Sequence, residues 1–132
     1  MCLFCDIIDN KIPSKRVYED DEFLAILDIA QITRGHTLVM PKKHFDNIFD
    51  VDDETLAKLT VLTKKLARQI TGATKAEGCN ILNNCNAVAG QSIMHLHFHI
   101  LPRYGADDDI SVDYKPTHTY DLDEVLSELK AG

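Results

Sequence analysis

The fold of this chain rests on one segment, Ile93-Met94-His95-Leu96-His97-Phe98-His99-Ile100-Leu101-Pro102, in which histidines alternate with apolar residues. Successive side chains of a β-strand point to opposite faces of the sheet. The three histidines would therefore share one face, and Met94, Leu96, Phe98 and Ile100 would share the other and pack on the core. Because half of the six histidines of the chain lie within five residues, we predict a strand over residues 94–103 that presents a row of imidazoles.

The remaining sequence predicts the elements around this strand. Apolar residues recur at helical spacing over 53–71, after a cap at Asp52 or Asp53 and before a stop at Gly72. Asp121, with Glu124 three positions on, predicts the start of a C-terminal helix. A short helix is expected over 3–9, and strands are expected over 15–19, 22–28, 37–41 and 78–84. We therefore expect an α+β fold: an antiparallel sheet of about five strands with one long helix packed on it and short terminal helices.

The composition is that of an ordinary globular protein, and its 132 residues suit a single domain. The net charge of −7 argues against nucleic acid and against an anionic membrane as partners. No targeting segment and no apolar run long enough for a membrane helix is visible, so we expect a cytoplasmic protein with reduced cysteines. Cys79 and Cys85 are expected to pack as small apolar side chains.

The row of histidines permits three interpretations. It could be a solvated strand face, a metal site of the His-x-His kind, or a nucleophilic centre. An imidazole with a pKa of about 6.5 is largely neutral near pH 7 and keeps one bare nitrogen. The uncharged donors of Gln91, Ser92 and Asn84 favour the third interpretation, because such groups stabilise a phosphoryl transition state.

Cys2-x-x-Cys5 has the spacing of one half of a tetrahedral zinc site. No second Cys-x-x-Cys follows, so the other two ligands must come from distant parts of the sequence. A redox pair is the alternative, but no thioredoxin-like βαβ unit surrounds the motif.

The pattern Gln91-Ser92-x-x-His95-x-His97-x-His99 resembles the signature of the histidine triad (HIT) family. The segments 4–13, 17–20, 27–29 and 35–44 also resemble the family pattern in order and spacing. The resemblance covers about residues 2–104, which implies one HIT-like domain with a C-terminal tail and helix over 105–132. The Arg103 after Leu101-Pro102 is similar to the bacterial branch of the family.

Membership would imply hydrolysis or transfer of a nucleotidyl group through a covalent nucleotidyl-histidine. Carried over by position, His97 is the nucleophile, and His99 and Gln91 contact the α-phosphate. Ser92 lies on the side of the leaving group, and Asn84 contacts the phosphate or the ribose.

The resemblance also implies a nucleoside pocket, a metal site and an assembly. Asp28 would bind the ribose hydroxyls, and His36 would lie close to the triad as a structural or orienting partner. The apolar clamp around the base would consist of Leu3, Phe4, Ile7, Ile26 and Ile29. A structural zinc site would be completed by His44 and His95 together with Cys2 and Cys5. The family further implies a homodimer with the helix 53–71 and part of the sheet at its interface.

The leading functional hypothesis is a nucleoside phosphoramidate hydrolase or an AMP-releasing relative that acts on a purine nucleotide such as an AMP derivative. A dinucleoside polyphosphate hydrolase would share the same chemistry and differ in its leaving-group pocket. Two further alternatives are a nucleotide-binding regulatory module of low turnover and a histidine-rich metal-binding protein without nucleotide chemistry. The sequence does not identify the physiological substrate.

Overall fold

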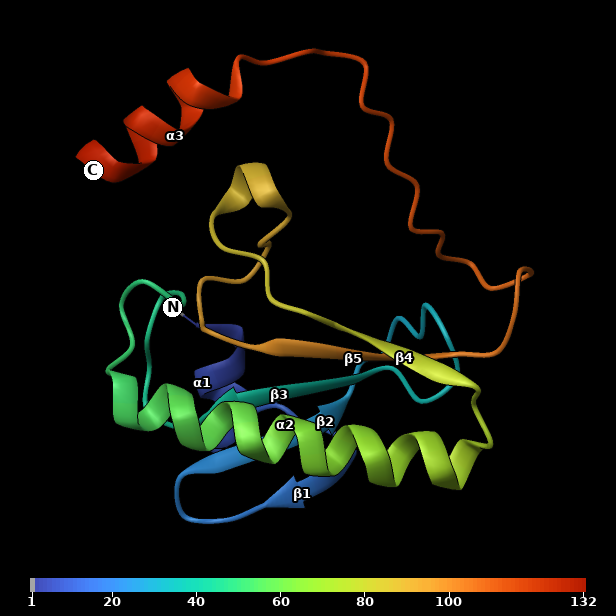
Figure 1. The fold of residues 1–132 in the computed structure, drawn as a ribbon. Coiled ribbons are helices and arrows are strands. Elements are labelled where there is room, and N and C mark those ends of the chain that lie inside the picture. The colour runs from blue at the N-terminus through green and yellow to red at the C-terminus, as the bar shows by residue number, and fades with distance from the viewer. Residues whose placement is uncertain (1) are drawn as a thin grey trace.

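A computed structural model describes residues 2–132 and contains one five-stranded antiparallel sheet with a long helix on one face (Figure 1). The strands are β1 (Arg16–Glu19), β2 (Phe23–Leu27), β3 (Thr37–Pro41), β4 (Gly78–Leu82) and β5 (Phe98–Arg103), and their order across the sheet is β1-β2-β3-β5-β4. The helices are α1 (Leu3–Ile8), α2 (Asp53–Thr74), α3 (Leu122–Ala131) and the short 3-10 helix η1 (Ala87–Ala89). The predicted α+β fold is therefore confirmed.

The two faces of the sheet are covered by different helices. On one face, Leu59, Leu66 and Ile70 of α2 belong to the same buried cluster as Phe98 and Ile100 of β5. On the other face, α1 packs on the sheet, and the buried residues of this second cluster are Phe4, Ile7, Leu24, Ile26, Leu38 and Met40. Because strand side chains alternate, His99, which lies between Phe98 and Ile100, faces the α1 side.

The helix α2 begins as predicted and ends later than predicted. The Asp52 carboxylate accepts a hydrogen bond from the Thr55 amide at 3.0 Å, which caps the first turn. Gly72 was expected to stop the helix, but α2 continues to Thr74, and Lys75 takes the left-handed conformation with φ 61°. A glycine inside a helix costs about 1 kcal/mol relative to alanine and does not by itself end the helix.

The predicted strand 94–103 is too long, because β5 begins only at Phe98. The preceding residues leave the ladder to bond elsewhere: the Leu96 amide donates to the Phe45 carbonyl at 2.7 Å, and His95 Nε2 donates to the Pro41 carbonyl at 2.8 Å. Only His99 of the three histidines lies in the strand. The expected alternation holds for Leu96, which is buried with Phe98 and Ile100, but Met94 is exposed.

The other strands lie where they were predicted: β3 has the predicted bounds, and β1, β2 and β4 are one or two residues shorter. The β4 strand stops at Leu82 instead of residue 84, and the Asn83 side chain donates to the His97 carbonyl at 3.1 Å. In the register of the sheet, His99 lies between Leu38 of β3 and Leu82 of β4. This places the histidine on the strand next to the β4 edge of the sheet, close to the end of β4.

The chain after β5 leaves the sheet. Residues 111–124 are all exposed, and α3 lies apart from the sheet at the end of an extended segment (Figure 1). The predicted cap of α3 is confirmed, since the Asp121 carboxylate accepts from the Asp123 amide at 3.0 Å. None of the helices in residues 2–132 combines the length and the apolar character that crossing a membrane requires.

Candidate functional site

His97 is held in one orientation by its own backbone neighbourhood. Its side chain is 7% exposed, and Nδ1 lies 2.7 Å from the His95 carbonyl oxygen. A carbonyl only accepts hydrogen bonds, so Nδ1 carries the proton and Nε2 of the neutral ring is bare. Within residues 2–132, Nε2 makes no hydrogen bond and is not among the buried nitrogen atoms that lack one. Nε2 is therefore a lone-pair donor that is open to a ligand.

The side chains of His97 and His99 are neutral at pH 7. Burial lowers the pKa of His97, and the hydrogen bond to the His95 carbonyl offsets part of this effect. Burial, followed by the proximity of His97 and His36, lowers the pKa of His99 to about 4. The ring centroids of His97 and His99 are 4.9 Å apart, so protonation of either ring would disfavour protonation of the other.

His36 connects His99 to an acidic residue. His36 Nε2 lies 3.0 Å from His99 Nδ1 and 3.7 Å from a carboxylate oxygen of Asp28. The carboxylate favours a proton on His36 Nε2, which is then donated to His99 Nδ1 and leaves the proton of His99 on Nε2. The buried His36 ring therefore lies between Asp28 and His99.

A mainly apolar pocket of about 370 Å³ lies between α1, β2 and the segment before β5. It brings together the predicted base clamp with Asp28 and Ser92, and the clamp residues that line it are Leu3, Phe4, Ile7, Ile26 and Ile29. Phe4 links this pocket to the histidines, because its ring packs edge-on against His97 with centroids 4.9 Å apart. Ile29 is fully exposed at the rim of this pocket.

The polar residues before β5 divide into two groups. The Gln91 side chain is buried and bonds only to backbone: it donates to the carbonyls of Asp46 at 2.6 Å and Ile93 at 3.1 Å and accepts from the Asn86 amide at 2.9 Å. Gln91 therefore fixes the loop in this arrangement. Ser92 is exposed and lines the pocket. Asn84 lies beside Gly90, at which an added Cβ would approach its amide nitrogen to 3.4 Å.

A second group of side chains gathers at the N-terminal end of α1. The ligand atoms of Cys2, Cys5, His44 and His95 all lie within 4.8 Å of one another. Nδ1 of His95 is 3.4 Å from Cys2 Sγ, 3.6 Å from Cys5 Sγ and 3.2 Å from Nδ1 of His44. Zinc bonds of about 2.3 Å to sulfur and about 2.0–2.1 Å to nitrogen place the ligands of a tetrahedron about 3.3–3.8 Å apart. These separations therefore fit the edges of a zinc tetrahedron.

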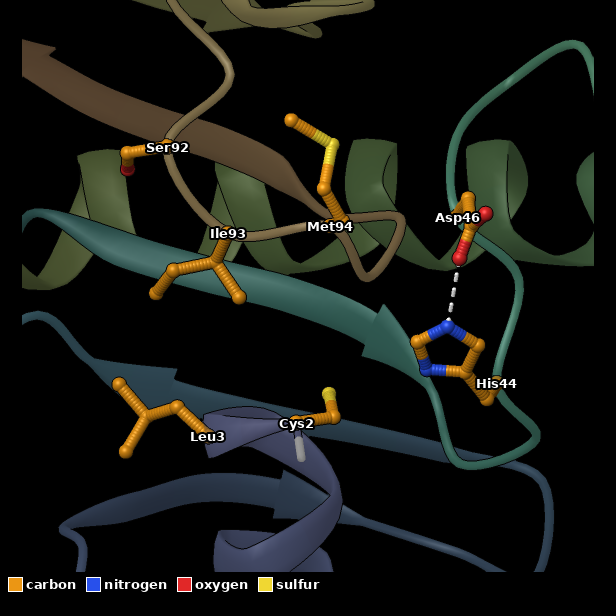
Figure 2. Close-up of a pocket in the computed structure, with 7 residues that line it drawn as sticks. All are labelled: Cys2, Leu3, His44, Asp46, Ser92, Ile93 and Met94. Atoms are coloured by element: carbon orange, nitrogen blue, oxygen red, sulfur yellow. Dashed lines mark hydrogen bonds and ion pairs between the residues drawn. The ribbon is translucent and has the colours of Figure 1, made fainter.

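The imidazoles of this group are oriented for metal binding. His95 Nε2 donates to the Pro41 carbonyl at 2.8 Å, and His44 Nε2 lies 2.7 Å from a carboxylate oxygen of Asp46. Both hydrogen bonds leave Nδ1 bare and turned towards the thiols, an arrangement common around protein zinc. Figure 2 shows His44 between Asp46 and Cys2. The Cys5 amide also donates to Cys2 Sγ at 3.3 Å, which stabilises a thiolate.

The two thiols require a cation to ionise together. Burial, with the hydrogen bond and charge of Cys2, raises the pKa of Cys5 to about 11. A divalent ion would deprotonate both thiols, because a coordinating thiol gives up its proton outright. Two thiolates and two neutral imidazoles form a closed set that suits structural zinc.

A more polar hollow of about 480 Å³ opens beside this group (Figure 2). It is lined by Cys2, His44, Asp46 and Met94, and it shares Leu3, Ser92 and Ile93 with the apolar pocket. The two hollows therefore meet at Ser92.

Comparison with known proteins agrees with this geometry. The model of the HIT domain family matches residues 9–106. The chain belongs to the HIT domain family. A crystal structure of a HIT family member from Bacillus subtilis superposes with a TM-score of 0.90 at 43% identity, covering 98% of this chain and 95% of that chain.

Two further HIT structures are similar to this chain. A hypothetical histidine triad nucleotide-binding protein from Sulfolobus tokodaii is 42% identical, with a TM-score of 0.78 over 97% of this chain and 88% of that chain. A zinc-bound histidine triad protein from Mycobacterium smegmatis is 36% identical, with a TM-score of 0.78 over 98% of this chain and 96% of that chain.

Within this HIT domain, the structure gathers the predicted residues into two adjoining groups, around His97 and around Cys2. Sequence reasoning missed Asn83, which holds the His97 carbonyl, and Asp46, which orients His44. It also missed Ile12, Pro13 and Leu38 in the wall of the apolar pocket. Asp46 could have been found from its spacing two residues after a predicted metal ligand, whereas Asn83 gave no signal apart from its position at a strand end.

Proposed function

We propose that this HIT protein binds a purine nucleotide derivative and transfers or hydrolyses its nucleotidyl group through a nucleotidyl-His97 intermediate. The proposal rests on one observation: the proton of His97 is committed to the His95 carbonyl, which leaves Nε2 bare beside Phe4 and the apolar pocket. The 42% identity to a hypothetical histidine triad nucleotide-binding protein supports it.

The chemistry follows from the bare nitrogen. The Nε2 lone pair of His97 forms a bond to the α-phosphorus, and the bond from phosphorus to the leaving group breaks with its electron pair. The leaving amine or phosphate takes a proton from the solvent. A water oxygen then attacks the same phosphorus and gives up a proton to the solvent, the electron pair of the P–N bond returns to His97, and a nucleoside monophosphate is released.

The remaining site residues would hold the nucleotide during these steps. The nucleoside would occupy the 370 Å³ pocket, with its base against Leu3, Phe4, Ile7, Ile26 and Ile29. Asp28 would accept from the ribose hydroxyls, for which a carboxylate is suited. His99 would donate to the α-phosphate, Ser92 would serve the leaving group, and Asn84 would donate to the phosphate or the ribose. Gln91 would act on the α-phosphate after a change of its hydrogen bonds, or by fixing the loop around it.

Zinc is proposed as a structural ligand of Cys2, Cys5, His44 and His95. Bound there, it would tie α1 to the segment that carries His97, since His95 lies two residues before the nucleophile. The chemical step requires no metal, because its donors are protein groups.

We also propose a homodimer in the cytoplasm. An apolar groove of about 400 Å³ lies between α2 and the edge strand β4, and it is lined by Ala67, Thr71, Cys79 and Ile81 with Lys64 and Arg68 at its rim. A second copy would cover this groove. The four free cysteines fit a reducing compartment. Static light scattering should give twice the chain mass of 14.8 kDa, and a single-chain mass would contradict the dimer.

The test of the catalytic proposal is to locate the intermediate. The protein is mixed with adenosine phosphoramidate or an aminoacyl-adenylate analogue, quenched within the first turnovers, digested, and sequenced by mass spectrometry. We expect an adenylyl group on His97 and its loss in His97→Ala. His118→Ala is the matched control, because His118 is exposed and remote from the cluster. An adduct on another residue, or turnover by His97→Ala above a few per cent, would contradict the proposal.

A further inference from the structure

The C-terminal arm, residues 105–132, ends in an amphipathic helix whose apolar residues are exposed within residues 2–132. Leu122, Leu126 and Leu129 of α3 recur at helical spacing and are 49–78% exposed. Val112, Tyr114 and Tyr120 of the extended segment are exposed as well. Apolar surface of this kind is normally covered, because a helix buries its apolar stripe against another element.

The start of the arm is fixed to the sheet. Arg103 at the end of β5 donates to Asn80 of β4 at 2.7 Å, to the Asp108 carboxylate at 2.9 Å and to the Ile110 carbonyl at 2.7 Å. The arm therefore leaves the molecule in a defined direction from the β4 edge. Figure 1 shows the ribbon of the arm running back above those of β4 and β5, so that α3 ends beyond η1.

The sheet edge beneath the arm also exposes apolar side chains. β4 is an edge strand of the sheet, and its Ile81 and Leu82 side chains are exposed. An edge strand offers unpaired backbone groups to another chain. The apolar groove beside it, rimmed by Lys64 and Arg68, adds to this unpartnered face.

The position of the arm is shared with a relative. The match to the Bacillus subtilis structure spans 98% of this chain at a TM-score of 0.90, so it includes the arm. An arm without contacts to its own sheet keeps one position only if something else supports it.

The charges indicate what that support is. The arm's helix and cap carry Asp121, Asp123, Glu124 and Glu128 against a single Lys130. This acidic helix would be repelled by nucleic acid or by an anionic membrane. The basic residues Lys64 and Arg68 of α2, which rim the apolar groove of a second copy, would attract it.

We propose that the C-terminal arm lies across a second copy of this chain, which meets the first at the β4 edge, and that the two copies exchange arms. This inference rests on the homodimer proposed above and adds that the apolar face of α3 is buried on the partner. Each copy would thus fill the space between the arm and the sheet of the other.

Photocrosslinking of the full chain tests the exchange. p-Benzoylphenylalanine is placed at Leu126, and at the exposed loop residue Phe49 as a control. Illumination should give a covalent dimer from the Leu126 variant at protein concentrations where the Phe49 variant gives little. Mixing isotope-labelled and unlabelled chains should show crosslinked peptides that join the two kinds of chain. Crosslinks confined to one chain, or none in a protein of dimeric mass, would overturn the exchange and leave the homodimer standing; a monomeric mass would overturn both.

A substitution series gives a second, independent readout. Leu122→Ser, Leu126→Ser and Leu129→Ser together should raise the dimer dissociation constant at least about tenfold, since burial of even one leucine is worth that much. Asp123→Asn combined with Ser127→Ala is the matched control on the polar part of the same helix and should raise it less. An unchanged constant in the triple variant would refute the proposal, provided that circular dichroism shows the fold intact.

Discussion

Phe4→Ala is the substitution that best tests how the nucleoside pocket and the histidines are joined. The Phe4 ring is 2% exposed, lies in the cluster with Leu24, Ile26 and Leu38, and packs edge-on against His97. Its removal leaves a cavity beneath α1 as well as a widened pocket. Truncation of a buried phenylalanine to alanine costs about 3–5 kcal/mol, and an edge-on aromatic pair adds about 0.5–1.5 kcal/mol. We therefore expect the free energy of unfolding to fall by about 4 kcal/mol.

The assay is equilibrium urea unfolding at a fixed zinc concentration, followed by circular dichroism. Phe49→Ala is the matched control, because Phe49 is 82% exposed and its loss should change the free energy of unfolding by less than about 0.5 kcal/mol. The reasoning is refuted if Phe4→Ala costs less than about 1 kcal/mol or no more than the control. In protein that remains folded, Phe4→Ala should also raise the KM for an AMP derivative, because the base loses part of its apolar wall.

Three further predictions follow from single features of the structure. His44→Ala should reduce bound zinc to below about half an equivalent per chain by metal analysis, whereas Cys85→Ser should leave it unchanged, since Cys85 lies outside the four-ligand group. Stability should fall with acid: the folded pKa of His99 is about 4 against about 6.5 when unfolded, so the unfolded chain binds more protons between these values. The free energy of unfolding should therefore rise from pH 4 to pH 6.5, and the rise should be smaller in His99→Asn; an equal slope in both proteins would contradict this. Lys75→Gly should raise the melting temperature, with a gain of about 0.5–1 kcal/mol, because φ of 61° is strained for lysine and free for glycine; a lower melting temperature would argue against it.

Sequence patterns that depend on residues a few positions apart predicted the helix caps and the buried helix face correctly. The caps at Asp52 and Asp121 were confirmed, because a side-chain oxygen satisfies free amides only two or three residues away. The apolar spacing predicted the buried face of α2, since helical periodicity alone decides which side chains meet the sheet. The prediction that Gly72 ends the helix was wrong, because a helix tolerates one glycine when the flanking turns still pack.

The arrangement of the histidines needed the tertiary structure. Alternation placed His95, His97 and His99 on one strand face, but only His99 is in the strand, and the other two are turned by bonds to the Pro41 carbonyl and to the His95 carbonyl. The Leu96 amide also donates to the Phe45 carbonyl outside the sheet, and no periodicity in the segment reveals this bond. The resemblance to the HIT family supplied the grouping of His44 with Cys5, which spacing alone could not give.

The sequence by itself thus predicted the helices and the strands apart from the start of β5, because these depend on contacts over a few residues, and its motifs predicted the family. The tertiary structure alone decided that Cys2 and His95, 93 residues apart, bring their ligand atoms to 3.4 Å. It also decided that Nε2 of His97 is the bare nitrogen and that the arm leaves the sheet instead of packing on it. Contacts between residues that are far apart in the sequence determine the histidine tautomers, the geometry of the metal ligands and the exposed faces. The sequence pattern does not show which of these distant groups will be in contact.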